Sequence, residues 1–273
     1  MTTEKLYRLN GVELCAETFG APADPAILLI HGAGASMIWW DDRLCGRLAE
    51  HGRYVIRYDQ RDTGRSTSYP VGAPQYAMSD LAADAAALLD ALGVEQAHVI
   101  AQSMSGGIAL ILGVDHPDRV ASLTIVSSST GDEGLPPPVP TMPRVEAPDF
   151  GDRAAVEEYV VRAIEAEAAG QFDEASARAL VRADLARTRD YEAAMTNHYA
   201  MTFDGPRHGG FGELTQPVLV IHGDADPLLP LPHGAAIRDA VPGARWLVMP
   251  GMGHGLSEPY WDAFVAAVLE HTR

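Results

Sequence analysis

Three residues whose side chains could act together in nucleophilic catalysis lie in three separate loops of the sequence. Ser103 follows an apolar run at 97–101 and comes just before a glycine pair that begins at Gly106. A serine hydroxyl is a weak nucleophile at neutral pH, so it needs a histidine to accept its proton and a carboxylate to orient the imidazole. Asp226 and His254 follow later, each in a loop after another apolar run. We therefore predict that Ser103, His254 and Asp226 form a catalytic triad.

The residues around Ser103 have the sizes that a sharp turn between a strand and a helix requires. A nucleophile on such a turn tolerates only small residues two positions before and after it, and Ala101 and Ser105 meet this rule. Ser105 fits the same rule in a second register, between Ser103 and Gly107. We prefer Ser103 because it directly follows the apolar run, whereas Ser105 would already lie in the helix. Taken alone, Ser103 could equally be a helix N-cap.

The acid and the histidine are identified by their places in the two later loops. Of the ten histidines, His254 alone lies in a glycine-flanked loop after the last apolar run, at 246–249. The preceding loop holds two acids, and Asp226 lies further along it, before a proline. Asp224 is the better candidate for capping a turn. Because both loops follow predicted strands, Asp226 and His254 can approach Ser103 at one edge of a sheet.

Negative charge develops on the substrate's carbonyl oxygen when the serine attacks. Backbone N–H groups aimed at that oxygen stabilise the charge, and together they form an oxyanion hole. The N–H of Met104 is one predicted donor, because it lies at a helix start, where the helix dipole adds positive potential. The second predicted donor is the N–H of Ala33, in the loop 31–34 after the first predicted parallel strand. We assign the His31 side chain in this loop a structural role.

The glycines of the same loop also resemble part of a nucleotide-binding pattern. Gly32 and Gly34 follow a predicted strand, and Asp59 at the end of the next strand could bind a ribose. Met37 occupies the place of the third glycine, however, which argues against dinucleotide binding.

Apolar runs of strand length alternate with helical segments over most of the chain. Two extended segments, 6–9 and 13–19, open it. Buried-type strands are predicted at 26–30, 54–58, 97–101, 123–126, 218–221 and 246–249, and helices at about 38–50, 79–92, 106–115 and 260–269. Such short apolar runs are typical of parallel strands covered on both faces, and the alternation predicts an α/β fold.

This alternation stops between 131 and 213. A proline cluster at 136–148 is followed by three helical stretches, at about 152–169, 173–187 and 190–202. We predict that 131–213 is a helical cap, inserted into a core made of 1–130 and 214–273. The predicted cap carries 8 arginines against 16 acidic residues.

The composition excludes several classes of protein. A chain of 273 residues with 47% apolar residues can bury a sizeable core. Its net charge of −17 would repel nucleic acid and anionic membranes. The amino terminus lacks the pattern of a signal peptide, and no run approaches the roughly 18 apolar residues of a membrane span, so we expect a cytoplasmic protein. Cys15 and Cys45 are expected to be buried free thiols, and no metal or cofactor is expected.

These motifs together resemble the α/β-hydrolase superfamily over the whole chain. The resemblance is carried by the serine turn, Asp226, His254, the loop 31–33 and the segment 59–66, which reads as a hydrogen-bonded scaffold. It implies the chain order Ser, Asp, His. It also implies a mostly parallel eight-stranded sheet with one antiparallel strand, helices on both faces, and a cap inserted after the sixth strand.

Within that superfamily, segments 57–67, 226–234 and 250–254 are most similar to the aclacinomycin methylesterases, which act on anthracyclines. Those enzymes hydrolyse the carbomethoxy ester of an aromatic polyketide through an acyl-enzyme, without metal or cofactor. The resemblance implies a small aromatic ester as substrate. Met104 and five further residues could form pocket walls for such a ligand, with ordinary core packing as the alternative. These five are Trp39, Trp40, Tyr191, Met195 and Tyr199.

Other functions share the predicted triad. Hydrolysis of a thioester, a lactone or a C–C bond, or general carboxylesterase activity, would use the same three residues. A ligand-binding relative without enzymatic activity is a further alternative. Epoxide and alkyl-halide hydrolases use an aspartate nucleophile, so Ser103 argues against them.

Overall fold

The computed structural model describes residues 4–139 and 146–273, and its strands form one twisted, mostly parallel sheet. The strand order over these residues is β1-β2-β4-β3-β5-β6-β7-β8. The strands are β1 (Lys5–Leu9), β2 (Val12–Phe19), β3 (Ala26–Ile30), β4 (Tyr54–Tyr58), β5 (Ala97–Gln102), β6 (Val120–Val126), β7 (Val218–Gly223) and β8 (Arg245–Met249). Only β2 runs against its neighbours, β1 and β4, as the resemblance implied.

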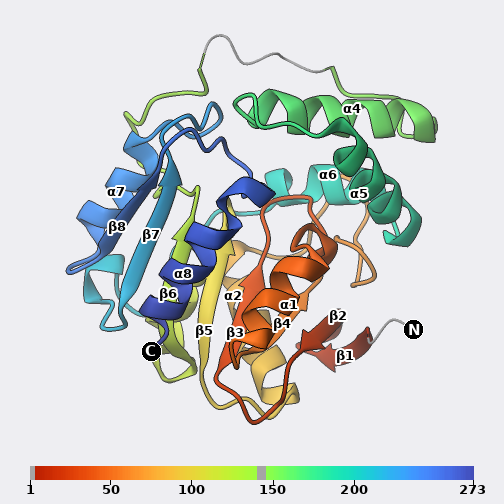
Figure 1. The fold of residues 1–273 in the computed structure, drawn as a ribbon. Coiled ribbons are helices and arrows are strands. Elements are labelled where there is room, and N and C mark those ends of the chain that lie inside the picture. Colours follow the sequence, from red (N-terminus) through yellow and green to blue (C-terminus); the bar gives the residue numbers. More distant parts are fainter. Residues whose placement is uncertain (1–3, 140–145) are drawn as a thin grey trace.

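Helices cover both faces of this sheet, with α1 and α8 on one face and α2, α3 and α7 on the other (Figure 1). These helices are α1 (Asp42–Glu50), α2 (Met78–Ala91), α3 (Ser105–Asp115), α7 (Pro232–Ala240) and α8 (Trp261–His271). Successive residues of a strand point to opposite faces. In β3, Leu28 and Ile30 therefore pack towards α2 and α3, whereas Ile27 and Leu29 pack towards α1 and α8.

The structure differs from the predicted helices in two places. The helix expected at 38–50 is split, because Asp41 accepts a hydrogen bond from the Arg43 N–H and caps a new start at Asp42. A short 3-10 turn precedes it. Helix α7 was not predicted, since it buries few apolar side chains, although Pro232 at its first position is a start signal. The 3-10 turns are η1 (Met37–Trp39), η2 (Pro117–Arg119), η3 (Phe211–Glu213) and η4 (Glu258–Tyr260).

Three helices lie between β6 and β7 in the chain and are grouped beyond one end of the strands (Figure 1). They are α4 (Arg153–Glu167), α5 (Glu174–Arg187) and α6 (Tyr191–Ala200). Each begins at an aspartate whose carboxylate accepts from backbone N–H groups of the first turn. Helices α4 and α5 share a small apolar cluster of their own. We call α4 to α6 the cap helices; Pro140 and Pro143 of the proline cluster lie outside the described residues.

Both cysteines are buried in the core. Cys15 lies in β2 and Cys45 in α1, and neither forms a disulfide. Burial raises the pKa of each thiol to about 12. In the described part of the chain, no helix has the length and apolar character needed to cross a bilayer.

Candidate active site

Ser103 lies on the sharp turn between β5 and α3, with its backbone in the left-handed region at a φ of +54°. The turn is held by three hydrogen bonds: the Ser103 N–H donates to Val126 O, and the Ser103 carbonyl accepts from the Gly106 N–H and the Ser128 hydroxyl. A Cβ at Gly106 would lie 2.1 Å from Ser128 Oγ. Strained backbone of this kind persists only where its surroundings fix it.

The side chains predicted to form the triad lie within hydrogen-bond distance of one another. His254 Nε2 is 2.9 Å from Ser103 Oγ, and His254 Nδ1 is 2.8 Å from Asp226 Oδ2. With neutral imidazole, Nδ1–H donates to the carboxylate and Nε2 accepts from the serine hydroxyl. This tautomer leaves Nε2 free to take the serine proton.

The carboxylate of Asp226 is fixed by further contacts. Its Oδ1 accepts from the N–H groups of Leu228 and Leu229, both at 2.9 Å. The fully buried His222 donates from Nε2 to Leu229 O at 2.8 Å and so supports the same loop. Asp224 has a different partner, the Gly251 N–H, which links the loops after β7 and β8. The aspartate loop is therefore held in one conformation.

The environment of His254 favours its protonated form. Burial disfavours the imidazolium, but the hydrogen bond and charge of Asp226, together with the charge of Glu167, outweigh it and raise the pKa of His254. Asp226 is itself 3% exposed and His254 5% exposed. Proton transfer from serine would therefore produce an imidazolium that its surroundings stabilise.

Two backbone N–H groups beside Ser103 have no protein acceptor. Over the described residues, the N–H groups of Ala33 and Met104 donate to no other protein group. Gly32 lies against the serine, since a Cβ there would be 3.0 Å from Ser103 Cβ. The predicted oxyanion donors thus come from the two loops that meet at Ser103. We call residues 31–36 the oxyanion loop.

Ser105, the alternative nucleophile, has a different role in the structure. It is fully buried at the start of α3, and its hydroxyl donates to His31 O at 2.5 Å. Gln60 also donates to His31 O, at 2.8 Å, so both side chains fix the oxyanion loop. The His31 ring lies against Trp39 and Trp40, and burial together with His254 lowers the pKa of His31 to about 3.

The residues predicted as pocket walls fall into different places. Trp40 is 2% exposed and packs in the core beside α1, which favours the alternative of ordinary core packing for this residue. Trp39 donates to Asp184 of α5 and packs, with Tyr191, against the cluster shared by α4 and α5. Met195 places its sulfur near Gly34, and Tyr199 is 67% exposed on the same helix, α6.

The segment 59–66 is a hydrogen-bonded scaffold, as the sequence indicated. Ser66 donates to Asp59 O and accepts from the Cys15 N–H, and Arg61 forms a buried bidentate pair with Asp84. Sequence reasoning did not single out Gln60 within this segment, nor Glu167. The only sequence signal for Gln60 is its place within the motif 59–66, and no sequence pattern indicates a role for Glu167.

Comparisons with known proteins match this architecture. A family model described as the alpha/beta hydrolase fold matches residues 25–258. The chain is 34% identical to the rhodomycin D methylesterase DauP of Streptomyces sp. strain C5, over 98% of both chains. It is 32% identical to the rhodomycin D methylesterase DnrP of Streptomyces peucetius, over 96% of this chain and 95% of that one.

Solved structures agree on the fold. An enol-lactonase from Burkholderia xenovorans LB400 superposes with a TM-score of 0.76 at 22% identity, covering 98% of this chain and 99% of that chain. An esterase from Exiguobacterium antarcticum gives a TM-score of 0.78 at 20% identity, over 100% and 99%. Together with the family match and the two methylesterases, these likenesses identify the chain as a member of the α/β-hydrolase family.

Proposed function

We propose that this chain is a serine hydrolase that cleaves the methyl ester of an anthracycline-type aromatic polyketide. The observation that carries the hydrolase assignment is the pair of hydrogen bonds that joins Ser103, His254 and Asp226. The methyl ester and the polyketide are supported by two relatives, 34% and 32% identical over nearly the whole chain, that are named rhodomycin D methylesterases.

The first half-reaction forms an acyl-enzyme. Ser103 Oγ attacks the ester carbonyl carbon while His254 Nε2 accepts the hydroxyl proton, and Asp226 stabilises the resulting imidazolium. The carbonyl oxygen becomes an oxyanion held by the N–H groups of Ala33 and Met104. When the intermediate collapses, the bond to the methoxy oxygen breaks and His254 donates its proton, so methanol leaves.

The second half-reaction uses water in place of the serine. His254 Nε2 accepts a proton from the water, whose oxygen attacks the acyl carbon, and the same two N–H groups hold the second oxyanion. Collapse breaks the bond to Ser103 Oγ and returns the proton to it. The net change is one ester and one water converted into one carboxylic acid and one methanol.

The substrate would lie between the oxyanion loop and the cap helices. Met195, one turn before Tyr199 on α6, lies beside Gly34 of that loop. Their side chains fall on one face of the helix. We place an aromatic ring system against Met195 and Tyr199, which would leave the ester at Ser103.

The test is made with two serine variants and two kinds of substrate. We expect Ser103→Ala to lose turnover and labelling by a fluorophosphonate probe, since Ser103 Oγ is the hydroxyl within hydrogen-bond distance of His254 Nε2. Ser105→Ala is the matched control, and it should still be labelled because Ser103 remains. Labelling of Ser103→Ala, with none of Ser105→Ala, would reassign the nucleophile.

Methanol release from aromatic polyketide methyl esters, followed by mass spectrometry of the acid product, tests the substrate. Turnover of p-nitrophenyl acetate without turnover of any such methyl ester would reject the methylesterase assignment and keep the hydrolase assignment. A wild-type chain that neither turns over an ester nor reacts with the probe would reject both.

A further inference from the structure

The oxyanion loop and the turn behind it are held from the side of the cap helices. The Gly34 N–H donates to His198 Nδ1 of α6 at 3.1 Å. The Ser36 hydroxyl donates to Asp184 of α5 at 2.5 Å, and the Trp39 indole N–H donates to the other oxygen of the same carboxylate at 2.8 Å. Three residues in the segment after β3, Gly34, Ser36 and Trp39, are therefore held by side chains from another part of the chain.

His198 makes this contact in a single protonation state. Its Nε2 lies 2.8 Å from the carbonyl oxygen of Arg61, which can only accept, so Nε2 carries the proton and Nδ1 is the acceptor for Gly34. The side chain is fully buried, and its ring meets Tyr76 edge-on. Burial lowers the pKa of His198, which keeps the ring neutral. The imidazole thus bridges the oxyanion loop and the scaffold segment 59–66.

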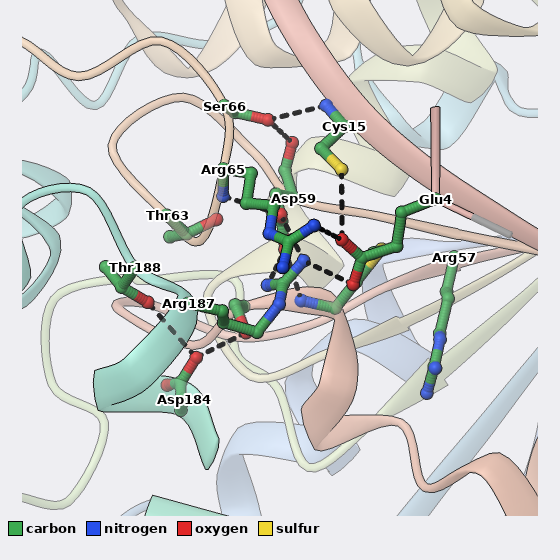
Figure 2. A network of polar contacts seen from close by, with 12 residues as sticks. Glu4, Cys15, Arg57, Asp59, Thr63, Arg65, Ser66, Asp184, Arg187 and Thr188 are labelled. Atoms are coloured by element: carbon green, nitrogen blue, oxygen red, sulfur yellow. Dashed lines mark hydrogen bonds and ion pairs between the residues drawn. The ribbon is translucent and has the colours of Figure 1, made fainter. Parts of the chain in front are cut away.

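A second link joins α5 to the same region (Figure 2). Arg187 pairs with both oxygens of the fully buried Asp59, at 2.8 Å each. Asp59 also accepts from the Met37 N–H, just after the oxyanion loop, and from the Arg65 N–H. A buried carboxylate of the core is therefore neutralised by an arginine of the cap helices, and the backbone after Ser36 is fixed through it.

Fixing Gly34 fixes the proposed oxyanion donor. The peptide planes that carry the Ala33 and Gly34 N–H groups are separated only by φ and ψ of Ala33. Gly34 has a φ of +72°, in the region that favours glycine, and a loop with two glycines has many conformations open to it. The hydrogen bond to His198 selects one of them.

We propose that His198 is a positioning residue for the oxyanion hole, so that the docked cap completes the catalytic site as well as facing the substrate. Through Gly34 it holds the Ala33 N–H towards the carbonyl oxygen at Ser103. Asp184 and Arg187 hold the continuation of the same loop. This inference rests on the proposed hydrolase function.

The experiment measures hydrolysis of p-nitrophenyl acetate, a substrate too small to need walls supplied by the cap. We expect His198→Ala to lower kcat about 10-fold to 100-fold, because one oxyanion donor is typically worth 10²–10³ in turnover and would here be misplaced rather than lost. KM should change by less than about 3-fold, because an oxyanion donor stabilises the transition state rather than the bound substrate. His198→Gln, which keeps one acceptor and one donor, should recover part of the rate.

Asn197→Ala is the matched control. Asn197 is also fully buried on α6, and it also bonds the core, through the Gly72 N–H and the carbonyls of Tyr69 and Pro70. Among the described residues, none of its side-chain hydrogen bonds goes to the oxyanion loop. Its loss should weaken cap docking without lowering kcat to the same extent. Inhibition by trifluoroacetophenone, whose adduct with serine carries an oxyanion, should weaken in His198→Ala and not in Asn197→Ala.

Equal losses of kcat in the two alanine variants would overturn the proposal, because they would show a general need for cap docking. Wild-type rates in a folded His198→Ala would overturn it as well, and so would a folded His198→Gln that is no faster than His198→Ala. An inert wild-type enzyme would instead refute the hydrolase function on which the inference rests.

Discussion

At the scale of single residues, His254 is held by its backbone as well as by its ring. Its N–H donates to Glu167 O at the end of α4, at 2.9 Å, and its carbonyl accepts from Gln102 at 3.1 Å. A Cβ at Gly253 would lie 2.3 Å from the same Glu167 carbonyl, so only glycine allows this approach. The last turn of a cap helix therefore helps to place the histidine.

Glu167→Gln should move the acidic limb of the pH–rate profile to lower pH. The charge of Glu167 contributes to the raised pKa of His254, and only neutral His254 can accept the serine proton. Without that charge the imidazole loses its proton at a lower pH, so kcat/KM near pH 6 should rise relative to its plateau. Measuring kcat/KM for p-nitrophenyl acetate from pH 5 to 9 checks this.

The control for this variant is Glu165→Gln, since Glu165 is exposed on the same helix and pairs with Arg162. It should leave the profile unchanged. A limb that stays in place in Glu167→Gln, or moves to higher pH, would contradict the expectation.

The sequence identified the residues whose chemistry is visible in their type and setting, and missed those that act through tertiary contacts. A serine between an apolar run and a glycine pair, and a histidine between glycines, are local patterns. His198 and Gln60 are ordinary in their own segments, and they acquire a role only when α6 and the segment 59–66 meet the oxyanion loop.

At the scale of elements, two helix glycines have opposite surroundings. A Cβ at Gly106, in the first turn of α3, would lie 2.1 Å from Ser128 Oγ and 2.8 Å from Ile125 Cγ2, whereas Gly46 in the middle of α1 faces open space. The first glycine makes room for the hydrogen bond that fixes the Ser103 turn. The second only weakens its helix.

Gly106→Ala should destabilise the protein by about 1–3 kcal/mol through overpacking. Gly46→Ala should stabilise it by about 0.5–1 kcal/mol, because alanine is the better helix former. Urea unfolding of both variants measures the difference, and esterase activity should fall only in Gly106→Ala. Similar unfolding free energies for the two would show that the Ser128 contact relaxes without cost.

The predicted bounds of a strand are most accurate where all of its residues are buried and apolar. Strands β3 and β4 match their predicted bounds because every residue in them is buried and the sequence there is almost wholly apolar. Strand β6 begins at Val120, three residues before the predicted start, since Ser122 is polar in sequence yet buried in the sheet. A polar residue that bonds within a core cannot be distinguished from an exposed one by its type.

For the whole molecule, the cap helices and the core differ in how their stability arises. The cluster shared by α4 and α5 has four buried members, all valine, while the clusters on the two faces of the sheet are far larger. Between α4 and α5, Arg162 with Glu174 is an exposed ion pair, as is Arg162 with Glu158 within α4, and pairs of this kind add little. Arg178 with Glu157 is the more buried ion pair between the two helices.

Amides of α4 should therefore exchange hydrogen through an opening that leaves the core folded. Those of β5 and α3 should exchange only on global unfolding, since they lie in the largest cluster. Hydrogen-exchange mass spectrometry at several urea concentrations below the unfolding transition separates local opening from global unfolding. The exchange rate of α4 amides should depend weakly on urea concentration, and that of β5 amides steeply. Equal dependence in both would mean that cap and core unfold as one unit.

The two buried cysteines give this enzyme an internal reporter of that difference. Cys15 and Cys45 are the only thiols in the chain, both belong to the core, and their high pKa values leave little thiolate to react. Cys45 packs in the apolar cluster between α1, α8 and the sheet, so an alkylating reagent would label it only in molecules whose core had opened there. Cys15 lies beside Glu4, which pairs with Arg187 of α5, so its labelling would also report movement of that cap helix. The ratio of the two labels would compare the two kinds of opening directly, without any engineered probe.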